Sequence, residues 1–186
     1  MTKEEIEKKE LKNKRMIGII IVVLMVLSTA GYAFFSGGTS NLKKIKYNNI
    51  DFLLSEDGKW HFTILGKEFS TYHNPNEVKN IKILGNFSIE DYYNFPLYTH
   101  FENDKEIQDE ILYNLYGIYS RANNFCFSDE SCDWVEKNCQ EDNLLIIKKS
   151  QNSLITKNDK CIYIYFNETE GLKVADAFIF KLLKIT

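Results

Sequence analysis

The chain has 186 residues, a formal net charge of −3, 44% hydrophobic residues and 26% charged residues. With only two prolines and nine glycines, this composition excludes a long disordered tract and favours a folded protein. Residues 16–186 carry a net charge of about −5 and no stripe of basic residues that could follow a phosphate backbone. Nucleic acid is therefore not a predicted partner.

Residues 1–15 form a charged leader with six Lys or Arg residues. Three Glu–Lys pairs in the leader stand four residues apart, in the order that stabilises a helix. The pairs are Glu4–Lys8, Glu5–Lys9 and Glu10–Lys14. The leader is therefore predicted to be helical, either as a solvated extension of the next segment or as a helix that docks a partner.

Residues 16–35 form a run of 20 residues without a charge. At about 1.5 Å per residue, a helix of that length crosses the hydrocarbon core of a bilayer, which is about 30 Å thick. We predict a transmembrane helix here, with the lipid bilayer as its partner. The alternative is a cleaved signal peptide, whose apolar region is usually shorter, with Gly31–Ala33 as a weak cleavage site.

The basic residues on the two sides of this segment predict its orientation. Six precede it and three follow closely, and basic residues favour the cytoplasmic side of a membrane. The N-terminus is therefore predicted to be cytoplasmic. The predicted organisation is a leader (1–15), a transmembrane helix (16–35), a linker (36–44) and an extracytoplasmic domain (45–186) at the cell membrane.

The domain is predicted to begin with an antiparallel meander over residues 45–72. Two segments rich in β-branched and aromatic residues flank Asp57–Gly58, and this dipeptide is a strong hairpin signal. A second tight turn is expected at Leu65–Lys67. Alternating apolar residues then predict a strand at 78–84, and a further strand is expected at 96–101.

The second half of the domain combines strands with two helices. A helix is predicted over 104–121, and its apolar face is Ile107, Ile111, Leu115, Ile118 and Tyr119. A second helix over 169–184 has a buried stripe of Val174, Ala175, Phe178, Ile179 and Leu182. Strands are expected at 143–149, 154–156 and 161–166. The predicted fold class is α/β: a transmembrane helix followed by one mixed-sheet domain with an antiparallel meander and two main helices.

Four cysteines fall in the second half of the chain: Cys126, Cys132, Cys139 and Cys161. None forms the closely spaced pair that is typical of structural zinc sites or of thioredoxin-like redox motifs. An even number of cysteines in an extracytoplasmic domain favours two disulfides, with zinc binding and free thiols as alternatives. We favour the pairs Cys126–Cys132 and Cys139–Cys161, because the first closes a small loop and the second joins the starts of two predicted strands.

The candidate ligand-binding residues are His100, Glu102 and Asp104. They lie at the carboxyl end of a predicted strand, where open α/β sheets bind ligands. A catalytic interpretation would pair His100 with one of the two carboxylates as acid and base. Because the chain has no nucleophile motif and no glycine-rich phosphate loop, we predict no catalytic residue and no cofactor. No metal ligand is predicted, because the acidic residues near the cysteines lack calcium-loop spacing.

Two N-glycosylation sequons occur on the predicted outer side, Asn86-Phe87-Ser88 and Asn167-Glu168-Thr169. Asn86 and Asn167 are therefore candidate glycosylation sites.

Three segments carry a resemblance to a known group of proteins: YNNIDFLLSEDGKWHF, FPLYTHFEND and CIYIYFNETEGLKVADAFIFKLLKI. The chain resembles uncharacterised archaeal proteins that have one N-terminal membrane span and a small extracytoplasmic domain. The resemblance implies a location and an architecture, and it implies no activity.

The sequence thus favours a membrane-anchored extracytoplasmic domain with an interaction or structural role and a protein partner at the cell surface. The missing catalytic motifs favour a non-enzymatic role. The alternatives are a domain that binds a small extracellular ligand and, third, a membrane-bound hydrolase.

Overall fold

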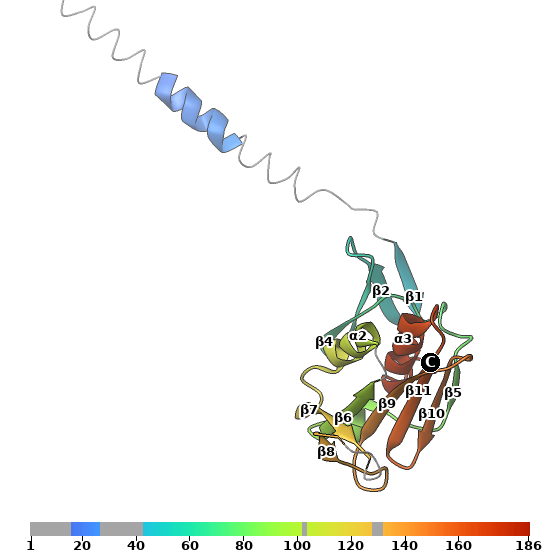
Figure 1. Ribbon diagram of the computed structural model, residues 1–186. Coiled ribbons are helices and arrows are strands. Elements are labelled where there is room, and N and C mark those ends of the chain that lie inside the picture. Colours follow the sequence, from blue (N-terminus) through green and yellow to red (C-terminus); the bar gives the residue numbers. More distant parts are fainter. Residues whose placement is uncertain (1–15, 27–42, 102–103, 128–131) are drawn as a thin grey trace, which may run out of the picture. The chain divides into compact units, whose positions relative to one another are not determined.

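The computed structural model describes residues 16–26, 43–101, 104–127 and 132–186 (Figure 1). The chain divides into two compact units, Met1–Leu42 and Lys43–Thr186. In the first unit, residues 16–26 form an α-helix. Within the described ranges, no helix is both long enough and apolar enough to span a membrane. The predicted leader and the second part of the predicted span, residues 27–35, lie outside the described residues.

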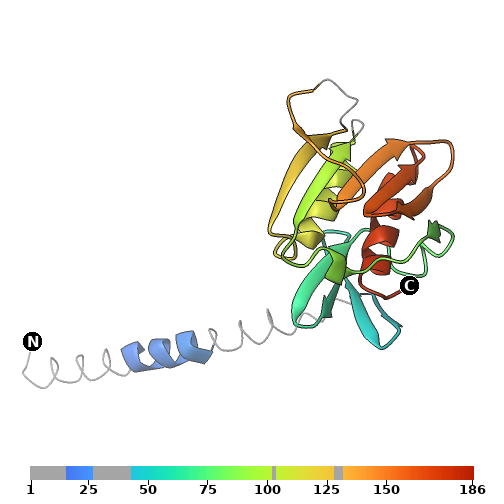
Figure 2. The same ribbon diagram turned by 90° about the horizontal axis from the view of Figure 1, so that it is seen from below.

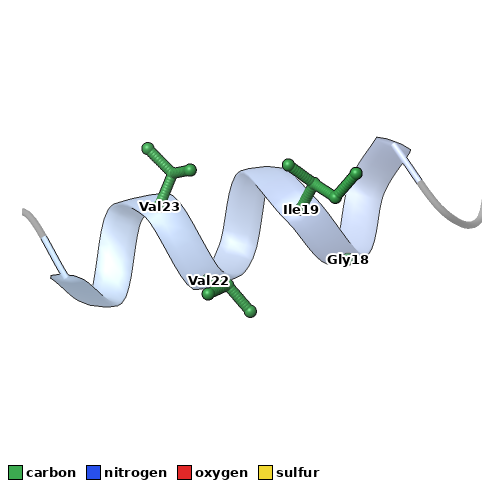
Figure 3. A pocket seen from close by; sticks show the side chains of 4 residues that line it. All are labelled: Gly18, Ile19, Val22 and Val23. Atoms are coloured by element: carbon green, nitrogen blue, oxygen red, sulfur yellow. The ribbon is translucent and has the colours of Figure 1, made fainter.

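The helix of residues 16–26 is apolar around its whole circumference. Every residue in it is exposed, and the sequence there is MIGIIIVVLMV. Figure 3 shows Ile19, Val22 and Val23 projecting from it, and together with Gly18 they line a shallow apolar hollow. A helix that is apolar on all sides is typical of a protein core or of a membrane segment.

The second unit begins with a four-stranded antiparallel sheet in the order β1-β2-β3-β4. Its strands are β1 (Lys44–Tyr47), β2 (Ile50–Leu54), β3 (Trp60–Ile64) and β4 (Lys67–Thr71). The predicted meander is confirmed. The first predicted strand is, however, two strands, because Asn48 and Asn49 adopt φ values of 45° and 64° and form a tight turn.

A seven-stranded mixed sheet follows, in the order β5-β10-β11-β9-β6-β7-β8. Its strands are β5 (Lys82–Leu84), β6 (Pro96–Phe101), β7 (Arg121–Cys126), β8 (Val135–Glu136), β9 (Leu144–Lys149), β10 (Leu154–Asn158) and β11 (Cys161–Phe166). Neighbouring strands from β11 to β8 are parallel, whereas β10 is antiparallel to β11. The predicted α/β class is confirmed, but the meander forms a sheet of its own.

Two predicted elements are shorter than expected. The strand predicted at 78–84 begins only at Lys82, because Pro75 opens a series of turns over residues 75–80. The helix predicted over 104–121 is α2 (Lys105–Leu115), and Gly117, with φ of 78°, lies just beyond its end. The residues after this turn form β7, which is not among the predicted strands.

The remaining helices are the 3-10 turn η1 (Ile89–Asp91) and α3 (Gly171–Leu182). Helices α2 and α3 lie between the antiparallel sheet and the mixed sheet (Figures 1 and 2). Helix α3 is enclosed from both sides, so that every residue from Val174 to Phe180 is buried. Phe180 contacts both Phe52 and Phe62 of the antiparallel sheet, at ring-centroid distances of 6.0 and 5.7 Å.

The two faces of the mixed sheet belong to two apolar clusters. The larger cluster combines the antiparallel sheet, α2, α3 and one face of the mixed sheet. The smaller cluster, on the opposite face, consists of Tyr98, Phe125, Leu144, Ile146 and Cys161, with Phe127, Cys139 and Tyr163 packed against it.

Candidate functional site

Two of the three residues of the predicted ligand site, His100 and Asp104, lie in the described part of the chain, and each contacts a different neighbour. His100 lies on β6, where its ring packs against Phe125 at 5.8 Å and its Nδ1 is 3.4 Å from the Phe125 carbonyl oxygen. Asp104 caps α2, because its Oδ1 accepts a hydrogen bond from the Ile107 amide at 3.3 Å. Glu102 lies outside the described residues. The predicted ligand site therefore stays a prediction.

The four cysteines are placed in the two favoured pairs, Cys126–Cys132 and Cys139–Cys161. The Cα atoms are 6.5 Å apart in the first pair and 5.0 Å apart in the second. Both positions of the second pair are held in the smaller apolar cluster, whereas Cys132 is exposed. In the described part of the chain, no group of three or more His, Cys, Asp or Glu side chains is placed to hold a metal ion.

The two sequon asparagines have different environments. Asn86 is exposed in the loop between β5 and η1. Asn167 is half-buried between β11 and α3, and its Nδ2 donates a hydrogen bond to Glu170 Oε2 at 2.8 Å.

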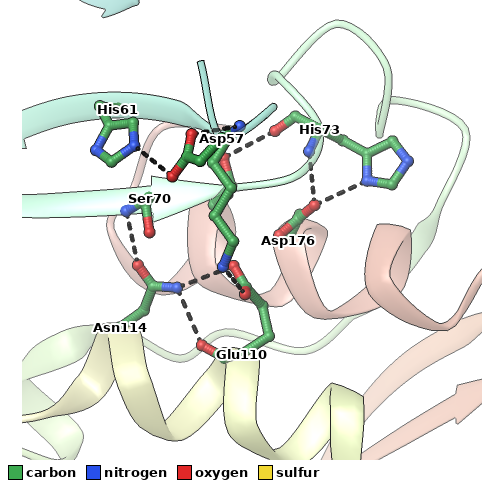
Figure 4. Close-up of polar contacts among 9 residues, drawn as sticks. Asp57, His61, Ser70, His73, Glu110, Asn114 and Asp176 are labelled. Atoms are coloured by element: carbon green, nitrogen blue, oxygen red, sulfur yellow. Dashed lines mark hydrogen bonds and ion pairs between the residues drawn. The ribbon is translucent and has the colours of Figure 1, made fainter. Parts of the chain in front are cut away.

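A cluster of buried and partly buried polar side chains joins the antiparallel sheet to both helices (Figure 4). We call it the Lys59–Asp176 cluster, and its members are Lys59, Ser70, His73, Glu110, Asn114 and Asp176. Glu110 and Asn114 come from α2, and they are 4% and 1% exposed. Lys59 directly precedes β3, and its Nζ donates a hydrogen bond to Glu110 Oε2 at 2.7 Å. This is a largely buried ion pair between a sheet and a helix.

Asn114 connects the same helix to the edge of the antiparallel sheet. Its Nδ2 donates to both the carbonyl oxygen and Oε1 of Glu110, at 3.0 and 3.2 Å. Its Oδ1 accepts from the backbone amide of Ser70 on β4 at 3.0 Å. Because β4 is an edge strand, this amide has no strand partner on that side, and the Asn114 side chain supplies the missing acceptor.

Asp176 on α3 binds His73, which lies two residues beyond the end of β4. Its Oδ2 accepts two hydrogen bonds from His73, one from the backbone amide and one at Nδ1, both at 2.8 Å. Oδ1 of this fully buried carboxylate has no hydrogen-bond partner among the described atoms. A buried oxygen without a hydrogen-bond partner lowers the stability of the folded chain. The two hydrogen bonds from His73 to Asp176 must offset this loss.

The electrostatics of the cluster are dominated by burial. Burial raises the pKa of Asp176, against the opposing effect of its hydrogen bonds from His73. Burial also raises the pKa of Glu110, against the opposing hydrogen bond from Lys59. Burial alone would lower the pKa of Lys59, but the hydrogen bond and charge of Glu110 raise it overall.

Burial acts unequally on the two partners of this ion pair. The raised pKa of Lys59 indicates a favourable pair, whereas the raised pKa of Glu110 indicates a carboxylate that is costly to ionise. Burial affects the carboxylate more strongly than the ammonium group, because the Glu110 side chain is 3% exposed and that of Lys59 is 21% exposed. The cluster positions β4 on the helices, and it holds two carboxylates that favour protonation more than exposed ones do.

A surface hollow of about 520 Å³ lies at the amino ends of β6, β9 and β11. Its lining includes Tyr98, whose hydroxyl accepts from the Arg121 guanidinium at 3.4 Å and whose ring lies 4.4 Å below Lys137 Nζ. The hydrogen bond from Arg121 lowers the pKa of Tyr98. This is the end of the parallel strands opposite to the predicted His100 site.

The lining of this hollow contains both positively and negatively charged side chains. Lys157 forms an ion pair with Asp91 at 3.3 Å, and Lys160 Nζ donates to the Glu141 carbonyl oxygen at 2.9 Å. Cys139 lies in the segment before β9 that contributes Glu141 to the lining, and Cys161 directly follows Lys160. The Cys139–Cys161 pair thus fixes two of the segments that form the hollow.

Part of the Lys59–Asp176 cluster has a signal in the sequence. Glu110 and Asn114 fall three residues after Ile107 and Ile111, on the apolar face of α2, and Asp176 interrupts the apolar stretch of α3. A polar residue on a buried stripe predicts a buried polar contact. The partners Lys59 and His73 follow only from how the antiparallel sheet packs on the helices.

Comparison with models of known families, with curated proteins and with solved structures finds no match to this chain.

Proposed function

We propose that the protein is a single-span membrane protein with a cytoplasmic N-terminus, and that its domain (45–186) works outside the cytoplasm as an interaction or structural module. The observation that carries the proposal is the pairing of all four cysteines. Disulfides persist in oxidising compartments and are rare in the cytosol. The proposal extends to a protein partner at the cell surface.

The apolar segment supports the same proposal. The helix of residues 16–26 exposes an apolar side chain at every position except Gly18. Such a surface is stable in hydrocarbon and unfavourable in water. In the proposal this helix continues to residue 35, so that residues 16–35 cross the lipid bilayer.

The experiment is protease treatment of intact cells, followed by detection of the leader and of the domain with separate tags. The proposal predicts that the domain is cleaved from outside, that the leader stays protected, and that the chain resists alkaline extraction. A domain protected in intact cells and cleaved only after lysis would contradict the proposed orientation. Crosslinking on intact cells then captures the proposed surface partner.

A second candidate function is the binding of a small extracellular ligand, and the hollow at Tyr98 favours it. Its lining places the cations Lys157 and Lys160 near several carboxylates, a combination that suits a zwitterion such as a free amino acid. The test is a thermal shift with each common amino acid. A rise in melting temperature that disappears in Tyr98→Phe would support this function, and no shift with any of them would contradict it.

A further inference from the structure

The two sequons present their asparagines in opposite ways. Asn86 lies in a loop whose flanking residues are fixed on the domain. On one side, Gly85 has φ of 110°, and a Cβ there would lie 2.7 Å from the Cβ of Lys157. On the other side, Phe87 is 3% exposed and packs on Phe178 of α3 at 5.7 Å. The loop is thus packed against β10 and α3, while the Asn86 side chain stays exposed.

Both ends of the Asn167 amide are occupied by neighbouring residues. Its Nδ2 donates to Glu170 Oε2 at 2.8 Å, and its Oδ1 accepts from the amide and the hydroxyl of Thr169, both at 3.0 Å. The residue is half-buried at the junction of β11 and α3. An amide nitrogen held against a carboxylate is poorly placed to reach an enzyme active site.

We propose that Asn86 carries an N-linked glycan and that Asn167 does not. The donor would be a lipid-linked, phosphate-activated oligosaccharide outside the cytoplasm. In the reaction, Asn86 Nδ2 forms a bond to the anomeric carbon of the sugar, the bond from that carbon to the phosphate oxygen breaks, and one proton leaves Nδ2. The inference rests on the proposed function, because the donor is reached only by a domain outside the cytoplasm.

The two positions also differ in what a glycan would disturb. At Asn86 a bulky polar group would extend into solvent from an exposed loop. At Asn167 it would replace a proton of Nδ2, which donates to Glu170 Oε2 at the half-buried junction of β11 and α3. The fold therefore tolerates the modification at one sequon and opposes it at the other.

The test is glycopeptide mapping of the full chain, purified from its own membranes, with the state of the four thiols measured in the same sample. The expected result is a glycan on the peptide with Asn86 and a bare peptide with Asn167. The Asn86→Gln variant should lose the entire glycan mass, whereas Asn167→Gln should keep it. In a matched control, Glu170→Ala releases the Asn167 amide, and modification that appears at Asn167 only in this variant would support the role of the hydrogen bond.

Three results would overturn the inference. A glycan on Asn167 of the unaltered chain would show that the hydrogen bonds of its amide do not protect it. A bare Asn86 in a chain with paired cysteines would contradict the inference and leave the proposed function standing. A bare Asn86 in a chain with free thiols would contradict both.

Discussion

The two faces of the seven-stranded sheet differ in how they are covered. One face packs against α2, α3 and the antiparallel sheet, and the resulting cluster contains most of the buried aromatic and aliphatic residues. The other face has a cluster of five buried residues, and the Cys139–Cys161 pair lies in it. A large apolar interface thus covers one face of the sheet, whereas the opposite face carries a small apolar cluster that contains a covalent link.

The covered face also contains two deeply buried carboxylates, Asp176 and Glu110. Its hydrophobic contacts allow α3 to bury Asp176 and α2 to bury Glu110. Asn114 of α2 holds Ser70 of the edge strand β4, and Asp176 holds His73, which follows that strand. The opposite face keeps its charged residues at the surface hollow, where Lys137 and Asp142 pair at 3.0 Å with each side chain 19% exposed. The carboxylates of Asp176 and Glu110 are buried more deeply than this pair, with exposed fractions of 0% and 4%.

The largest expected effect is the loss of packing on the covered face. Phe180→Ala removes a fully buried ring between the two sheets, and we expect it to lower the free energy of unfolding by about 3–5 kcal/mol. Chemical denaturation of the purified chain measures the change. Phe95→Ala is the control, because Phe95 is 56% exposed, and its loss should stay within about 0.5 kcal/mol. Equal losses in the two variants would contradict the proposed importance of α3.

The second largest effect is expected at the ion pair between Lys59 and Glu110 in the Lys59–Asp176 cluster. Lys59→Met leaves the Glu110 carboxylate buried without its cation, and we expect a loss of about 2–4 kcal/mol at neutral pH. The double variant Lys59→Met with Glu110→Gln should recover most of it, because no buried charge is then unpaired. Lys44→Met, which breaks an exposed ion pair, should leave the stability almost unchanged. If the double variant is as unstable as the single one, the loss is due to packing and not to charge.

The two disulfides are expected to differ in their contributions. In the chain-entropy model, the loop of 22 residues closed by Cys139–Cys161 gives about 3 kcal/mol, and the loop of 6 residues closed by Cys126–Cys132 gives about 2 kcal/mol. The paired variants Cys139→Ser/Cys161→Ser and Cys126→Ser/Cys132→Ser separate them in the same denaturation experiment. A larger loss for the Cys126–Cys132 pair would contradict the expected order of the two contributions.

The smallest expected effect is a gradual dependence of stability on pH. The folded chain binds protons at Asp176 and Glu110 more strongly than the unfolded chain, because burial raises the pKa of both groups. Stability from these two groups therefore falls as the pH rises above the ordinary carboxyl values of 3.8 and 4.5. Exposed Asp57 and Glu90 act in the opposite sense, because hydrogen bonds lower their pKa to about 2, and their contribution is lost only in stronger acid.

Melting temperatures from about pH 4 to about pH 8 test this dependence. In Asp176→Asn the decline of stability with rising pH should become shallower, because one of the two buried carboxyl groups no longer titrates. A variant curve that runs parallel to that of the unaltered chain would mean that Asp176 titrates alike in the folded and unfolded states.

The sequence was sufficient to predict those parts of the fold that depend on local patterns. Asp57–Gly58 predicted a hairpin, and the spacing of Ile107, Ile111 and Leu115 predicted the buried face of α2. Strand β7 was missed because its sequence, RANNFC, has few apolar residues. Its place in the sheet comes from pairing with β6 after α2.

The candidate site was predictable to a lesser degree. The cysteine pairing followed from loop size and predicted strand starts, both of which are readable along the chain. The Lys59–Asp176 cluster was not predicted, because the contact of Lys59 with Glu110 spans 51 residues and that of His73 with Asp176 spans 103. Such contacts depend on how two sheets pack around α3, and no local pattern records that arrangement.

The most direct test of the account is a map of the cysteines in the unreduced chain, extracted from its own membranes. Free thiols are alkylated with one reagent, the disulfides are then reduced and alkylated with a second reagent, and linked peptides are identified by mass spectrometry. The account predicts four protected cysteines, joined as Cys126–Cys132 and Cys139–Cys161. Four thiols that react before reduction would contradict the extracytoplasmic placement, and a different pairing would contradict the covalent support of the smaller cluster.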